Sequence, residues 1–140
     1  MKTLLCAVCF LLGLAACSAT SSIPDEPLQE RYWRLTAIDD QAPQSTTHQA
    51  EPHIVFGNNL RVHGSDGCNR FNGAYATTAG LRLGQLASTM MACPPPVDAL
   101  ARDFTRALAA TASYRITGRQ VELLDAEGRV RLRLEATFLK

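Results

Sequence analysis

Cysteines and histidines are the residues of this 140-residue chain best suited to catalysis, metal binding or cross-linking. No two histidines follow the His-x-x-x-His spacing of a helical metal site, and none lies at ligand spacing beside Cys68 or Cys93. The pattern therefore predicts neither a metal site nor a cofactor. The residues concerned are Cys6, Cys9, Cys17, Cys68 and Cys93, together with His48, His53 and His63.

Serine and carboxylate residues form no recognisable catalytic arrangement. Ser65 and Asp66 lie near His63, but no Gly-x-Ser-x-Gly elbow surrounds the serine, and a polar turn explains the cluster. Glu122 and Glu135 fall on predicted solvent faces, so they do not suggest a glycosidase pair. The sequence also lacks a glycine loop that would cradle a phosphate. We therefore predict that the protein is not an enzyme.

Cys17 closes an N-terminal segment typical of bacterial lipoproteins. Lys2 precedes an apolar stretch, 4–14, that is too short to span a bilayer but suits a signal peptide. The sequence Leu-Ala-Ala-Cys at 14–17 resembles a lipobox, which implies removal of 1–16 and acylation of Cys17 by diacylglycerol and a further chain such as palmitate. An ordinary secretory signal that contains a cysteine is the alternative. Stable membrane anchoring follows from several acyl chains.

The residues after Cys17 predict location and charge. The residue after Cys17 is Ser18 and not an aspartate. In lipoproteins of Gram-negative bacteria this pattern is associated with export to the outer membrane, so we expect a lipid-anchored protein that faces the periplasm. The segment 17–29 is rich in Ser, Pro, Asp and Glu and reads as a flexible tether. Without Lys2, the mature chain has equal numbers of basic and acidic side chains and no basic block, which excludes a typical nucleic-acid-binding protein. We expect one domain, 30–140, and a monomer.

Cys68 and Cys93 remain once the signal and the anchor are assigned. An even pair in an oxidising compartment favours a structural disulfide. A redox pair and half of a metal site are the competing interpretations, although neither cysteine lies in a Cys-x-x-Cys motif.

The hydropathy pattern predicts a sheet-rich domain with one helix. Residues 129–138 alternate apolar and polar side chains, which indicates a strand with one buried face. Pro94-Pro95-Pro96 ends any strand and opens a helix whose apolar stripe is Val97, Leu100, Ala101, Phe104 and Leu108. We predict an α+β domain in which a curled antiparallel sheet, partly closed like a barrel, packs around this amphipathic helix. The other expected strands are 32–38, 53–56, 60–63, 71–77, 81–86, 114–116 and 121–123.

Two motifs carry a family resemblance that covers about 30–139. The sequence of 67–75 fits Gly-Cys-Asn-x-Phe-x-Gly-x-Tyr, and that of 89–93 fits Thr-x-Met-Ala-Cys. Together they resemble the META domain, a family that includes heat-inducible lipoproteins of the HslJ type. The resemblance implies a compact β-rich domain with one helix, an envelope location, a link to stress responses and no established enzyme activity. Met90 departs from the pattern, because many members carry a basic residue there.

Two surfaces are candidate sites for a ligand or a partner. In the first motif we interpret the glycines and asparagines mainly as turn-forming residues, and a ligand patch of Asn69, Arg70 and Asn72 is the alternative. The second surface is the arginine row Arg129, Arg131 and Arg133, which suits an acidic partner or anionic lipid.

Two functions follow from these observations. We expect a non-enzymatic envelope protein that supports stress tolerance by binding a protein or surface component. The alternative is a carrier of lipid or a small ligand, with an apolar cavity lined by Ile54, Phe56, Phe104 and Leu132.

Overall fold

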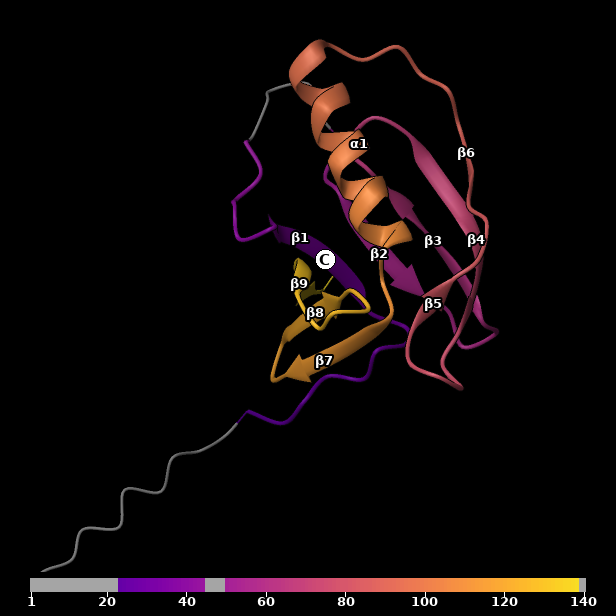
Figure 1. The fold of residues 1–140 in the computed structure, drawn as a ribbon, viewed down its shortest axis with the longest axis vertical. Coiled ribbons are helices and arrows are strands. Elements are labelled where there is room, and N and C mark those ends of the chain that lie inside the picture. The colour runs from indigo at the N-terminus through magenta and orange to yellow at the C-terminus, as the bar shows by residue number, and fades with distance from the viewer. Residues whose placement is uncertain (1–22, 45–49, 139–140) are drawn as a thin grey trace, which may run out of the picture.

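The computed structural model describes residues 23–44 and 50–138. The signal segment, Cys17 and His48 lie outside the described residues. Within them, nine strands form one antiparallel sheet around a single helix (Figure 1). The elements are β1 (Tyr32–Ile38), β2 (His53–Phe56), β3 (Arg61–Ser65), β4 (Arg70–Ala76), β5 (Arg82–Leu83), β6 (Ala87–Ser88), α1 (Pro95–Ala109), β7 (Ser113–Thr117), β8 (Gln120–Leu124) and β9 (Val130–Thr137).

The single helix and the antiparallel sheet confirm the predicted α+β class. The sheet is curled but does not close into a barrel. Its strand order is β5-β4-β3-β2-β1-β9-β8-β7, and β6 pairs with β4 beside β5. The chain after β4 nevertheless touches the start of β7, because the Leu81 N–H donates to the Ala112 carbonyl over 3.0 Å. Gly80 permits this approach: its φ is +85°, and a Cβ there would lie 2.2 Å from the Ala112 oxygen. One backbone hydrogen bond thus joins the two halves at the open side of the sheet.

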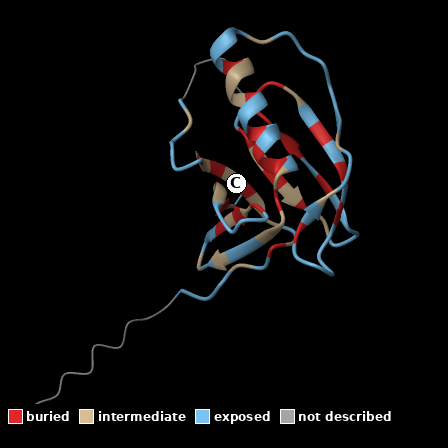
Figure 2. Cartoon of the chain, in the orientation of Figure 1, coloured by how far each residue is buried: buried red, intermediate tan, exposed pale blue. Residues whose placement is uncertain are grey.

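The core lies between α1 and the concave face of the sheet (Figure 2). Four members of the predicted helix stripe, Val97, Ala101, Phe104 and Leu108, are buried, and Leu100 packs against the core at its margin. Phe104 meets Phe71 of β4 with 6.1 Å between ring centroids. The four side chains proposed above to line an internal cavity, Ile54, Phe56, Phe104 and Leu132, are all fully buried within this one hydrophobic cluster.

The expected strand over 81–86 is wrong: only a two-residue strand forms within it, and a second short strand follows it. β5 covers only Arg82 and Leu83, and β6 begins at Ala87. The Gly84 N–H donates to the Ala74 carbonyl, and the chain then passes close over Gly73, where a Cβ would lie 2.6 Å from Leu86 Cδ2. The chain therefore turns as it crosses β4 and pairs with it twice, which a continuous apolar pattern does not reveal.

Part of the segment assigned to the tether contacts the domain. The Glu26 N–H donates to the Gly118 carbonyl over 2.8 Å, and the Asp25 carboxylate accepts from the Gly118 N–H over 2.6 Å. Leu28 is buried, and its carbonyl accepts from the indole N–H of Trp33 over 2.8 Å. The short polar residues that suggest a flexible tether here act as backbone partners for the β7–β8 turn.

Candidate ligand pocket on the outer face of the sheet

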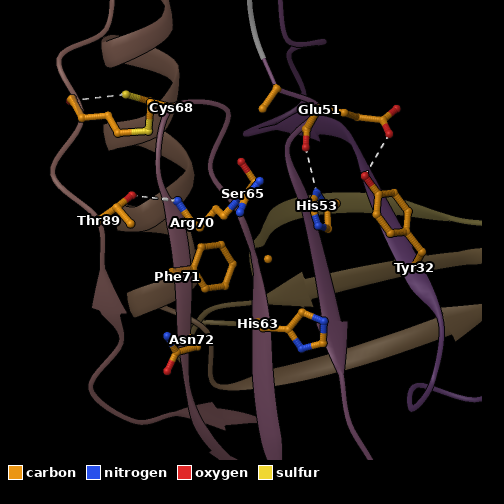
Figure 3. Close-up of a pocket in the computed structure, with 13 residues that line it drawn as sticks. Tyr32, Glu51, His53, His63, Ser65, Cys68, Arg70, Phe71, Asn72 and Thr89 are labelled. Atoms are coloured by element: carbon orange, nitrogen blue, oxygen red, sulfur yellow. Dashed lines mark hydrogen bonds between the residues drawn. The ribbon is translucent and has the colours of Figure 1, made fainter.

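A pocket of about 780 Å³ lies on the outer face of the sheet, over β2, β3 and β4 (Figure 3). Most of its exposed lining is apolar surface, with a few polar groups at its walls, and the buried ring of Phe71 contributes to its floor. The lining residues are Tyr32, Ala50, Glu51, His53, His63, Gly64, Ser65, Cys68, Arg70, Phe71, Asn72, Thr89 and Met91.

Strand register brings residues from separate motifs into this pocket. One cross-strand row runs from His53 through Ser65 to Arg70, and the next runs from Val55 through His63 to Asn72. These residues point outward because the alternate positions of the same strands face the core. Ser65 is the smallest of the row, so the surface is hollow between His53 and Arg70.

Gly64 allows β3 to lie close to both β2 and the ring of Phe71 beneath the pocket. A Cβ at this position would lie 2.1 Å from the His53 carbonyl oxygen and 2.8 Å from the ring of Phe71. Only glycine fits between β2 and the core ring at this point. The close approach of β2 and β3 thus depends on Gly64.

Tyr32, Glu51 and His53 form one wall of the pocket. The rings of Tyr32 and His53 stack with centroids 4.2 Å apart at 19°. The Tyr32 hydroxyl donates to the Glu51 carboxylate over 3.0 Å, and His53 Nδ1 lies 2.8 Å from the Glu51 carbonyl oxygen (Figure 3). Burial raises the pKa of Tyr32 well above its usual range, and the hydrogen bond to Glu51 raises it further. The phenol therefore stays protonated and acts as a donor.

Cys68 lines the opposite end of the pocket and forms a disulfide with Cys93. It ties the β3–β4 turn to the segment that leads into α1. Asn69 strengthens the same link, since its Oδ1 accepts from the Met91 N–H over 2.8 Å and from the Thr89 hydroxyl over 3.2 Å. Asn69 therefore fixes the loop, whereas Arg70 and Asn72 line the pocket.

The predicted arginine row does not join this site. Arg131 and Arg133 lie on β9 and Arg129 directly precedes it, and none of the three lines the pocket. Carboxylates surround all three arginines: Arg131 contacts Asp39 at 2.6 Å, Arg129 contacts Asp125 at 2.9 Å, and Arg133 pairs with Asp40 and Glu122. The row is thus largely neutralised by its neighbours.

The residues that resemble a hydrolase are part of the β3–β4 turn. Ser65 Oγ accepts from the Gly67 N–H over 3.1 Å, and Asp66 Oδ1 accepts from the N–H groups of Cys68 and Asn69. Gly67 has a φ of +99°, as the turn requires. Across residues 23–44 and 50–138, no three His, Cys, Asp or Glu side chains gather closely enough to hold a metal ion. Ser65 and Asp66 are therefore accounted for by the turn.

Sequence reasoning identified Arg70 and Asn72 but missed Tyr32, His53, Thr89 and Met91. The alternation of the strands predicts that His53 and Asn72 point outward. Which strands are neighbours, however, depends on the register of the whole sheet, and no local pattern encodes it.

Comparisons with known proteins identify a family and two solved relatives. The family model of the META domain matches residues 26–138. An NMR structure of a protein from Burkholderia xenovorans is similar, with a TM-score of 0.65 and 25% identity over 80% of this chain and 85% of that chain. A second NMR structure has a TM-score of 0.59 and 27% identity, over 76% and 89% of the two chains. None of the curated proteins matches the chain.

Proposed function

The chain belongs to the META domain family, and on that premise we propose that it is a lipid-anchored, non-enzymatic envelope protein that supports stress tolerance by binding an envelope component. The binding surface is the pocket over β2, β3 and β4. The observation that carries this proposal is the pocket itself, a hollow of about 780 Å³ whose mostly apolar lining includes Arg70, a side chain with no ion-pair partner among the described residues. Ligand sites are typically concave and have a few well-placed polar groups.

Two further observations support an envelope location. The Cys68–Cys93 disulfide suits an oxidising compartment, where such bonds persist. The lipobox-like sequence ending at Cys17 would attach the chain to a membrane through acyl groups. The helix in the described part of the chain is too short and too polar to cross a bilayer.

Fractionation of cells that produce the full chain tests the anchor. We expect the wild-type chain in the outer-membrane fraction, with an intact mass equal to the chain from Cys17 plus acyl groups. The variant Cys17→Ser should move to the soluble periplasmic fraction and lack the acyl mass. Membrane association of both chains, or an unacylated wild-type chain, would contradict the proposal.

Photo-crosslinking in living cells tests the binding surface. A photoreactive amino acid replaces Asn72 in the pocket or, as the matched control, Glu127, which is exposed at a distant turn. We expect light to produce a defined adduct from position 72 only. Equal adducts from both positions, or none from position 72, would argue against a binding role for this face.

A further inference from the structure

Eight of the twelve arginines among the described residues are paired with carboxylates. Of the other four, Arg119 donates to the Ala136 carbonyl, and three lie on one part of the outer face. Arg61, Arg70 and Arg82 lie on β3, β4 and β5 and take part in no ion pair among the described residues. Of the residues between 60 and 88, the only carboxylate belongs to Asp66, which is buried in the turn. The eight paired arginines are Arg31, Arg34, Arg102, Arg106, Arg115, Arg129, Arg131 and Arg133.

Arg70 is the one of these three that lines the pocket. Its backbone is fixed on both sides, because its N–H donates to Thr89 Oγ1 over 3.1 Å and its carbonyl accepts from the Thr89 N–H over 3.0 Å. The side chain extends over Ser65, its cross-strand neighbour (Figure 3). A well-fixed backbone thus presents to the pocket a guanidinium whose side-chain donors have no partner among the described residues.

Opposite Arg70 stands the stacked pair of His53 and Tyr32. Tyr32 covers one face of the imidazole at 4.2 Å, and the other side of His53 is turned toward Ser65 and the hollow (Figure 3). Glu51 is the only carboxylate among the lining residues. The Glu51 carboxylate accepts a hydrogen bond from the Tyr32 hydroxyl, and one of its oxygens lies 3.7 Å from Arg34 Nε, so its negative charge is partly neutralised.

From this arrangement we propose that the pocket binds a small planar aromatic anion, such as an aromatic carboxylate or sulfonate. The inference rests on the proposed binding role of this face. Arg70 holds the anionic group through charge-assisted hydrogen bonds, and the aromatic body lies against His53, with Phe71 beneath it. The pocket volume is within the usual range for sites that take small molecules.

The choice of an aromatic body follows from the shape and type of the walls. A flat ring pair at one end and a guanidinium at the other both favour planar groups. Most of the exposed lining is apolar, which suits the body of the ligand, and the competition experiment below distinguishes an aromatic body from an acyl chain.

Fluorescence titration with 8-anilinonaphthalene-1-sulfonate tests the proposal on the exported Cys17→Ser chain, which has no acyl groups to interfere. N-phenyl-1-naphthylamine, which lacks the sulfonate, is the neutral control ligand. We expect one saturable site for the sulfonate. Arg70→Gln should weaken its affinity about tenfold, in line with the loss of a hydrogen bond to a charged group, and leave the neutral ligand unaffected.

Arg82→Gln is the matched control variant, because it removes the same charge from the same face outside the pocket. Its effect should stay within twofold. Equal losses in Arg70→Gln and Arg82→Gln would reduce the binding to a nonspecific charge effect and overturn the proposal. Competition completes the test: 2-naphthoate should displace the probe, and stronger displacement by decanoate would overturn the aromatic class in favour of an acyl anion.

NMR mapping keeps the test independent of how well the variants fold. Addition of 2-naphthoate to the ¹⁵N-labelled Cys17→Ser chain should shift the amide signals of Arg70, His63 and Thr89 and not those of β7. Shifts elsewhere, or no saturable binding of the anion, would refute the ligand class. The crosslinks from position 72 would then still decide separately whether this face binds an envelope component.

Discussion

Asp66 fixes the turn between β3 and β4 with a single carboxylate oxygen. Its Oδ1 accepts from the Cys68 N–H over 2.9 Å and from the Asn69 N–H over 2.6 Å, and the residue is buried. The same turn carries one half of the disulfide and leads directly into Arg70. This side chain therefore determines the geometry of one end of the pocket.

Replacement of Asp66 by alanine should lower the free energy of unfolding by about 2 to 4 kcal/mol. Two buried or half-buried amides would lose their acceptor, and each unsatisfied group costs about 1–3 kcal/mol. Urea denaturation measures the change. Asp103→Ala, which removes an exposed partner of Arg106, should change stability by less than about 0.5 kcal/mol. Similar losses in both variants would show that the turn bonds contribute little.

Leu60 lies in a conformation that leucine rarely adopts. Its φ is +60°, and half of its surface is exposed at the β2–β3 turn. Asparagine tolerates this region better, so Leu60→Asn should raise the free energy of unfolding by about 0.5–1 kcal/mol. Leu60→Val should lower it, because a β-branched residue is less tolerant still. Denaturation midpoints that move in the same direction would contradict the assignment of strain.

Residue types alone predict some of these roles and leave others open. Gly57, Asn58 and Asn59 correctly indicate a reversal, but Leu60 was placed in the following strand, although it completes the turn. Asn69 was a candidate for ligand contact, whereas its amide oxygen serves the backbone of Met91. A polar side chain gives the same sequence signal whether its partner is a ligand or a distant backbone group.

At the level of elements, the disulfide links the β3–β4 turn to the segment before α1. Cys68 and Cys93 are 25 residues apart, and the enclosed chain contains β4, β5 and β6. A small cluster of Cys68, Val97 and Ala101, with Cys93 beside it, packs around the bond next to the main core. The link thus holds the β4–β6 region against the start of the helix.

Removal of the Cys68–Cys93 disulfide should lower the stability of the domain substantially. For a loop of 25 residues the loop-closure model gives about 3.5 kcal/mol. Cys68→Ser combined with Cys93→Ser should therefore lower the free energy of unfolding by about this amount in urea denaturation. The wild-type chain in reductant should match the double variant. An unchanged midpoint in both experiments would mean that the fold does not depend on the bond.

Periodicity identified the long elements well because their faces differ sharply in polarity. The alternation through β9 and the stripe of α1 both match the observed burial. The short strands β5 and β6 escaped detection, since two-residue strands have no periodicity. The sheet order was not predictable either: β1 pairs with β9 at the other end of the chain, and this pairing depends on complementary surfaces rather than on local pattern.

At the scale of the whole molecule, the β9 side of the outer face is a network of opposite charges. The hydrogen bond from Arg131 holds the pKa of Asp39 below its usual range. Burial raises the pKa of Glu122, but hydrogen bonds from Arg115 and Arg133 outweigh it and leave the pKa lowered. Burial also raises the pKa of Asp125, but hydrogen bonds from Arg129 outweigh this effect, so the pKa of Asp125 is lowered as well.

These lowered pKa values predict loss of stability in acid. The unfolded chain takes up protons first, so the contribution of these carboxylates is present above about pH 4, the ordinary Asp and Glu range, and declines as the pH falls through it. Urea midpoints measured from pH 6 to pH 2.5 should show this decline. The double variant Asp39→Asn and Arg131→Gln should show a shallower dependence. A slope identical to that of the wild type would exclude a role for the Asp39–Arg131 pair.

If Cys17 is acylated as proposed, the hydrogen bonds of Asp25 and Glu26 to Gly118 would also limit how far the domain can move from the membrane. Eight peptide units would then separate the acylated Cys17 at the bilayer surface from Asp25, the first residue hydrogen-bonded to the domain. Fully extended, this linker would span at most about 28 Å. In Figure 1 the chain leaves at the end of the molecule opposite the start of α1. A short linker at that end would keep the domain within about one molecular diameter of the lipid headgroups. When the linker is fully extended, the end that carries the disulfide would point away from the membrane. Anything that it recognises would then have to reside in, or arrive at, this thin layer above the membrane.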